Sequence, residues 1–298
     1  MDLENFEITD SYGIISDIHN EIEKVRKVLR FFEKEGIFKI LVPGDLCIDW
    51  NLRRWKEYQE KIPNKTLENQ IYDALTELSN GVEKLIVIPG NHDSKEPYNN
   101  ALQRVNKQNI VDLVKSSYYE DNNLVIFGTY GYFEYGRNIM FNELLFTKQW
   151  QLRFLKQEGF LFDEENFSKL GENLKKTPNS KIKVILSHFL PKTPDNINGP
   201  DTYGLIGNLG SESLTKLYRE IDEVIIIGGH THHNAGTFYD KEFIQLKTGQ
   251  LTKKAVINGG NLLEDKRDSI FKAEPKFGIL RIHNNNYVSF VPYNLREV

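Results

Sequence analysis

Short apolar runs recur along the chain and alternate with segments of helical periodicity. The runs are rich in isoleucine, valine and leucine and almost continuously apolar, as expected for strands that are buried on both faces. They span residues 12–15, 39–42, 84–88, 124–127, 183–186 and 224–227. Apolar residues at every third or fourth position predict helices over 22–32, 67–78 and 214–221. Alternating strands and helices predict a layered α/β fold with a largely parallel sheet.

Two stretches, 49–64 and 130–179, interrupt the alternation. The first carries aromatic residues and arginines, and the second combines glycine and aromatic residues with a helical tract. We interpret both as insertions over a functional site in a single domain spanning 1–298, because any central boundary would split the motifs described below. After residue 233 the pattern changes to short strands. These are predicted at 243–246, 255–257, 278–283 and 287–292, the last two joined by a turn of three asparagines.

The charge balance, 38 basic against 42 acidic residues, leaves a net charge of −4 and disfavours nucleic acid as a partner. The single cysteine, Cys47, cannot form an intramolecular disulfide and fits a reducing compartment. The acidic N-terminus does not resemble a signal peptide, and no apolar stretch approaches the ~20 residues that span a bilayer. We therefore expect a soluble cytoplasmic protein without a membrane partner.

Six of the seven histidines lie within five short motifs that each follow a predicted strand. The motifs are Ser16-Asp17-Ile18-His19, Gly44-Asp45, Gly90-Asn91-His92-Asp93, Ser187-His188 and Gly229-His230-Thr231-His232-His233. Ligands of open α/β sheets bind beyond the carboxyl ends of the strands, where these motifs would meet. Imidazole and carboxylate are the usual nitrogen and oxygen ligands of catalytic divalent metals, so the motifs predict one assembled metal site.

Spacing within the motifs suggests which side chains share an ion. Asp17 and His19 are two residues apart, and in an extended chain this spacing places both side chains on one face. The same argument pairs His230 with His232 and turns His233 to the opposite side, where a surface or supporting role is favoured over contact with substrate. One ion could therefore take both members of a pair.

A centre with two metals also needs a group that bridges them. A carboxylate offers two oxygens, whereas a neutral imidazole offers one acceptor nitrogen. Asp45 stands apart from the histidine pairs and is the natural candidate. Glycines at 44, 90 and 229 directly precede the motif side chains, as expected where the backbone turns sharply and packs close to a site.

In this order the five motifs resemble the calcineurin-like metallophosphoesterase superfamily, over roughly Tyr12 to His232. The resemblance implies a four-layer αββα sandwich of two mixed β-sheets flanked by helices, with two divalent ions. The metals implied are manganese, iron or zinc, all of which accept these nitrogen and oxygen ligands. By the resemblance, the ligands are Asp17, His19 and His232 for the first ion, Asn91, His188 and His230 for the second, and Asp45 as the bridge.

The resemblance also implies a reaction. Two ions about 3.5–4 Å apart would clamp a phosphate oxygen and share a hydroxide that attacks phosphorus. Asn91 would hydrogen-bond an equatorial oxygen of the phosphate. His92 would contact substrate rather than metal and act as the general acid for the leaving alkoxide. Either Asp93 or Asp49 would orient His92.

Two departures from the family's protein serine/threonine phosphatases narrow the substrate. In those enzymes the second motif continues with an acidic residue and an arginine, and a second arginine directly precedes Gly-Asn-His. This chain has Ile48 at the position of that acidic residue and Pro89 at the position of the second arginine. We therefore expect a phosphodiester or phosphomonoester of small or nucleotide-like size rather than a phosphoprotein.

Two alternatives remain from the sequence. A nuclease acting on DNA or RNA would call for a basic groove, which the net charge does not favour. A non-catalytic scaffold of the same fold would have lost metal ligands, and this chain retains each of those positions. His283 and Cys47 are interpreted as structural residues.

Overall fold

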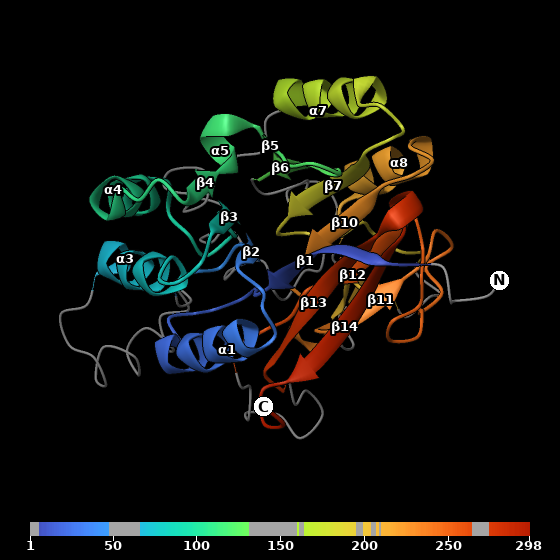
Figure 1. Ribbon diagram of the computed structural model, residues 1–298. Coiled ribbons are helices and arrows are strands. Elements are labelled where there is room, and N and C mark those ends of the chain that lie inside the picture. Colours follow the sequence, from blue (N-terminus) through green and yellow to red (C-terminus); the bar gives the residue numbers. More distant parts are fainter. Residues whose placement is uncertain are drawn as a thin grey trace.

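The computed structural model describes residues 6–47, 66–130, 160, 164–194, 199–203, 207–208, 210–263 and 274–298. Its centre consists of two six-stranded sheets packed face to face, with helices on the outer faces (Figure 1). The predicted stretch 49–64 lies outside the described residues, as does most of 130–179. Their interpretation as insertions over the site stays a prediction.

The first sheet has the order β14-β13-β1-β2-β3-β4. Strands β1 to β4 run parallel, while β13 pairs antiparallel with both β1 and β14. The strands are β1 (Ile8–Ile14), β2 (Lys39–Pro43), β3 (Lys84–Ile88), β4 (Ile110–Asp112), β13 (Lys276–His283) and β14 (Val288–Asn294).

The second sheet has the order β11-β12-β10-β7-β6-β5, with four parallel strands in the middle and an antiparallel strand at each edge. The strands are β5 (Tyr118–Glu120), β6 (Leu124–Thr129), β7 (Ile182–Ser187), β10 (Ile225–Gly228), β11 (Thr237–Tyr239) and β12 (Ala255–Asn258). A separate small pair joins β8 (Thr202–Tyr203) and β9 (Gly207–Asn208).

The helices form the two outer layers (Figure 1). Those on the first sheet are α1 (Ile22–Lys34), α3 (Leu67–Leu78) and α4 (Lys95–Val105), and those on the second are α7 (Glu164–Lys176) and α8 (Glu212–Glu220). The short elements are α5 (Leu113–Ser116), η3 (His232–Asn234) and η4 (Asn284–Asn286). This arrangement confirms the four-layer sandwich of two mixed sheets. No helix among the described residues is long and apolar enough to cross a membrane.

Alternation along each buried strand explains why the apolar runs are continuous. Ile40 and Val42 of β2 pack under the helices, while Leu41 between them points into the core between the sheets. In β7, Leu186 faces the core between the sheets, and Ile185 belongs to the cluster that packs under α7 and α8. Because both faces are covered, most positions of these strands are apolar.

One predicted strand is wrong. Residues 243–246 follow a turn and form no regular strand, with Phe243 at a φ of 59° and a single bridge between Tyr239 and Gln245. The side chain of Asp240 accepts hydrogen bonds from the backbone of Glu242 (2.8 Å) and Ile244 (2.9 Å). This local bonding competes with a strand ladder, which explains the error. The expectation of one largely parallel sheet is also corrected, because antiparallel strands occupy both sheets.

Candidate metal centre

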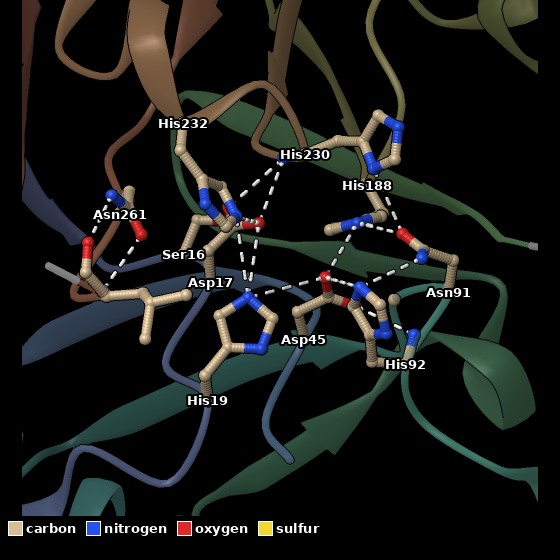
Figure 2. A network of polar contacts seen from close by, with 12 residues as sticks. Ser16, Asp17, His19, Asp45, Asn91, His92, His188, His230, His232 and Asn261 are labelled. Carbon is tan, nitrogen blue, oxygen red and sulfur yellow. Dashed lines mark hydrogen bonds and ion pairs between the residues drawn. The ribbon is translucent and has the colours of Figure 1, made fainter. Parts of the chain in front are cut away.

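The five motifs meet at the carboxyl ends of β1, β2, β3, β7 and β10, where the two sheets adjoin (Figure 2). A direct link between the sheets lies within the cluster, where Nδ1 of His188, after β7, donates to the carbonyl of Pro43 in β2 at 2.8 Å. The site is therefore built from both sheets.

The backbone at the motifs is not extended, contrary to the spacing argument. Asp17, His19, Asp45 and His230 have φ values of 49°, 46°, 57° and 68°, in the left-handed region that costs energy for residues other than glycine. Asp17 and His19 do converge, with Nε2 of His19 4.0 Å from Oδ1 of Asp17, but they do so through tight turns. His230 and His232 do not form a pair: His230 faces Asn91, whereas His232 faces Asp17.

Glycines let the motif loops nest against one another. A Cβ atom at Gly90 would lie 2.0 Å from Oδ1 of Asp45, and one at Gly229 would lie 2.2 Å from Oδ2 of Asp17. Real Cβ contacts below 3.0 Å essentially do not occur. Both glycines are thus required by close approach to a carboxylate.

A first group of ligand atoms comes from Asp17, His19 and His232. Nε2 of His232 lies 3.0 Å from Oδ1 of Asp17 and 3.4 Å from Nε2 of His19. The distance between Oδ1 of Asp17 and Nε2 of His19 is 4.0 Å. An ion bound at ~2.0–2.2 Å from each ligand would separate such atoms by about 3–3.5 Å. Nδ1 of His19 donates to the carbonyl of Cys47 at 3.0 Å, which directs Nε2 into the group.

A second group comes from Asn91, His188 and His230. Oδ1 of Asn91 lies 2.8 Å from Nε2 of His188 and 3.0 Å from Nδ1 of His230. Asp45 lies between the two groups, with Oδ2 3.2 Å from Nε2 of His188 and 3.8 Å from Nε2 of His19. The predicted ligand set is thus brought together in two groups that share one carboxylate.

Buried charge makes this cluster attractive to cations. Burial alone raises the pKa of Asp17, but His232 and His188 outweigh it and lower that pKa to about 2. Burial likewise raises the pKa of Asp45, but His188 and His92 lower it well below its usual value. Burial lowers the pKa of His188, yet Asp45 raises it to about 9. Two ionised carboxylates held away from water fit a site for divalent metal.

The sequence model of the family described as calcineurin-like phosphoesterase matches residues 11–234, most of the chain and all five motifs. This chain belongs to that family. A search of curated proteins finds no match.

Solved structures resemble this calcineurin-like phosphoesterase along nearly its whole length. A dimetal phosphatase from Danio rerio is 14% identical, with a TM-score of 0.55 over 97% of this chain and 100% of that one. A protein of Thermus thermophilus is 13% identical, with a TM-score of 0.52 over 97% and 100%. The calcineurin-like phosphoesterase YfkN from Bacillus subtilis is 11% identical, with a TM-score of 0.51 over 97% and 91%. At these identities the likeness shows a common fold.

His92 lies beside the cluster and is accessible. Its side chain is 20% exposed, with Nε2 3.6 Å from Oδ2 of Asp45 and 3.2 Å from Nδ2 of Asn91. Its backbone N–H donates to Oδ1 of Asp45 at 3.0 Å. These contacts place His92 where a substrate can reach it, and its role as acid stays a prediction.

Asp93 has a different set of partners from the one predicted. Its buried carboxylate accepts hydrogen bonds from the backbone N–H groups of Leu46 (3.0 Å), Cys47 (3.1 Å) and Gly90 (2.8 Å). Asp93 thus ties the loop after β2 to the loop after β3. Asp49, the alternative partner of His92, lies outside the described residues.

Sequence reasoning assigned no role to several buried polar residues beside the ligands. Oγ of Ser16 donates to Oδ2 of Asp17 at 2.7 Å (Figure 2), and the backbone N–H of Leu262 donates to the backbone carbonyl of Asp17 at 3.2 Å. Thr231 is also buried. The available signal was a polar residue next to a candidate ligand within a motif, as Ser16 is next to Asp17 and Thr231 is next to His230 and His232.

The two remaining histidines and the cysteine are structural or peripheral in position. His233 is half-buried in η3. Nε2 of His283 lies 2.9 Å from Oγ of Ser289 within the terminal hairpin. Cys47 is buried and donates from Sγ to the carbonyl of His92 at 2.9 Å, and burial raises the pKa of its thiol. A protonated thiol in such a position is a packed residue rather than a nucleophile.

Proposed function

We propose that this chain hydrolyses phosphodiester or phosphomonoester bonds of small or nucleotide-like substrates, with two divalent ions bound at the cluster. The observation that carries the proposal is the position of Asp45. Its Oδ2 lies 3.2 Å from Nε2 of His188 in one ligand group and 3.8 Å from Nε2 of His19 in the other. A carboxylate in that position can serve two ions at once.

Two divalent ions at such a centre supply Lewis-acid activation of the phosphate and lower the pKa of water toward about 7. Asp17, His19 and His232 would hold one ion, and Asn91, His188 and His230 the other, with Asp45 shared. Their imidazoles are held in place before any ion binds, since backbone carbonyls orient His19 and His188. Such fixed orientation of ligands raises metal affinity.

Two residues of the chain would act on the substrate. Nδ2 of Asn91 faces Nε2 of His92 at 3.2 Å, so the amide and the imidazole lie side by side at the accessible edge of the cluster. The amide N–H would donate to a phosphate oxygen on which negative charge accumulates. His92, when protonated, would donate its proton to the departing alkoxide oxygen.

The sequence around the site supports a small substrate. Pro89 stands where the family's protein phosphatases place arginine. A phosphodiester carries a single negative charge and needs less fixed positive charge than a monoester. We therefore propose that a nucleotide-like diester is hydrolysed in preference to a phosphoprotein.

The test is metal reconstitution followed by hydrolysis of a chromogenic phosphodiester and a chromogenic phosphomonoester, with metal counted in the same samples. We expect about two ions per chain and turnover of at least one ester. Asp45→Asn should abolish turnover and weaken metal binding at least about a hundredfold, since even outer contacts of a metal site are worth 10–100-fold. Occupancy of both ions should fall.

Asp10→Asn is the matched control. Asp10 lies on β1, at the end of the strand away from Asp17, and its carboxylate accepts from Lys39 at 2.7 Å. The same change of charge there should leave metal binding and turnover intact. Full activity of the Asp45→Asn protein would refute the shared carboxylate, and metal binding without turnover of either ester would refute the proposed activity.

A further inference from the structure

His230 and His232 belong to one short segment but to different ligand groups. This histidine loop, residues 229–234, lies between β10 and β11. Nδ1 of His230 faces Asn91 at 3.0 Å, whereas Nε2 of His232 faces Asp17 at 3.0 Å. Thr231 lies between them and is 2% exposed. Its conformation therefore sets how far apart the two imidazoles lie.

Thr231 is held from two sides by segments that are distant in sequence. Its Oγ1 donates to the carbonyl of Pro200 at 2.5 Å. Nδ2 of Asn258, the last residue of β12, donates to both the carbonyl and Oγ1 of Thr231, each at 2.9 Å. The hydroxyl thus acts as donor and acceptor at once, which valine could not imitate.

The orientation of the Asn258 side chain is fixed by these contacts. Asn258 is fully buried, and its Oδ1 has no hydrogen-bond partner. Reversing the amide would turn that oxygen toward the carbonyl of Thr231, where two acceptors would face each other. A buried acceptor without a partner costs stability. What the amide supplies at this position is its pair of N–H donors.

The segment that carries Pro200 makes further contacts with the histidine loop. Nδ2 of Asn234 donates to the carbonyls of Gly199 and Thr202, both at 2.9 Å. Within the segment, the buried carboxylate of Asp201 accepts from the N–H of Gly210 at 3.0 Å. The histidine loop is therefore fastened at its middle and at its end to one braced segment.

We propose that Thr231 is a positioning residue that fixes His230 and His232 so that each serves a different ion. The inference rests on the metal centre proposed above. His230 has a φ of 68°, a conformation that the loop does not favour by itself and that outside contacts must hold. Because metal–ligand distances tolerate only about ±0.2 Å, a loop released at Thr231 should lose affinity for both ions.

The test compares Thr231→Val with Thr231→Ser in protein stripped of metal and titrated with Mn²⁺ by calorimetry. Valine keeps the branched shape without the hydroxyl and should weaken Mn²⁺ binding about 10–100-fold, whereas serine should restore it. Thr252→Val is the matched control, because Oγ1 of Thr252 likewise donates to one carbonyl and accepts from one N–H, both of Lys254. It should lower stability to urea in EDTA and leave Mn²⁺ affinity unchanged.

Wild-type Mn²⁺ affinity in the Thr231→Val protein would overturn the positioning role and leave the proposed hydrolysis standing. If that variant does not fold, Asn234→Ala at a half-buried position tests the same brace, and unchanged affinity there would overturn the role equally. A wild-type protein that binds Mn²⁺ and hydrolyses neither ester would refute the proposed activity. In that case, weaker binding by Thr231→Val would still support the positioning role.

Discussion

Gly90→Ala should disable the metal centre although alanine is a small and otherwise tolerated residue. The added Cβ would lie 2.0 Å from Oδ1 of Asp45, 2.4 Å from its backbone nitrogen and 2.7 Å from its Cγ. The φ of Gly90 is not in the left-handed region, so the backbone itself accepts alanine. The whole effect of the substitution must therefore come from the clash with Asp45.

The size of the effect follows from the distance. Cβ contacts essentially never fall below 3.0 Å, so the carboxylate must move by about 1.0 Å from its 2.0 Å position. Metal ligands tolerate only about ±0.2 Å, and a misplacement of 1 Å in an active site costs about a hundredfold in rate. Overpacking should also cost about 1–3 kcal/mol of the free energy of unfolding.

Metal content, Mn²⁺ titration and diester hydrolysis of the Gly90→Ala protein measure the effect of the displaced carboxylate. Urea unfolding in EDTA measures the loss of free energy of unfolding. Gly171→Ala, within α7, is the control. A Cβ at this position would meet only Cδ1 of Leu217, at an ordinary contact distance of 3.4 Å. This variant should gain about 0.5–1 kcal/mol from helix propensity and keep its metal affinity. A Gly90→Ala protein with wild-type metal affinity would show that Asp45 does not need its observed position.

Two further perturbations separate other parts of the structure. His92→Ala should retain metal binding while slowing turnover most for esters with poor leaving groups, and equal slowing across a leaving-group series would count against His92 as the acid. Asp121→Asn should lower the free energy of unfolding at pH 6. Partial burial raises the pKa of Asp121, but the hydrogen bond from Lys39 and the N–H of Asn122 outweigh it and lower that pKa. Because the folded pKa is depressed, this stability is present above the unfolded pKa of about 3.9 and is lost as pH falls below it. The difference in free energy of unfolding between wild type and Asp121→Asn, measured by urea unfolding, should therefore be smaller at pH 3 than at pH 6. An equal difference at both pH values would show that the ionised carboxylate of Asp121 is not the source of this stability.

The main strands could be predicted because burial on both faces leaves a mark in the sequence. Continuous apolar runs such as Ile40, Leu41 and Val42 have no other simple explanation in a chain of mixed composition. The short strand β4 left no such mark, since Ile110–Asp112 is only half-buried. The irregular segment 243–246 was mistaken for a strand because hydrogen bonds to the side chain of Asp240, rather than the apolar pattern, determine its backbone.

The residues that gather at the site could be predicted, but the contacts that hold them there could not. The residue types and their order in the motifs identified the ligand candidates. How they are held depends on contacts between residues far apart in sequence, such as Asp17 with the N–H of His230, 213 positions away, or Asp93 with Leu46, 47 positions away. No local pattern encodes such pairs, which explains why the hydrogen bonds from the backbone to Asp93 were not predicted, and why Asp93 was one of two candidates to orient His92.

The two central carboxylates are each held by the backbone of another motif, and this interlocking decides which substitutions are informative. The N–H of His230 donates to Asp17, and that of His92 donates to Oδ1 of Asp45 at 3.0 Å. Alanine at position 45 would remove the charge and also leave a buried N–H without its acceptor, at a cost of about 1–3 kcal/mol. Asparagine removes the charge but keeps an oxygen for the N–H of His92. Loss of metal by Asp45→Asn therefore reports the charge shared between the two ligand groups, whereas loss by Asp45→Ala would mix that effect with a loosened loop.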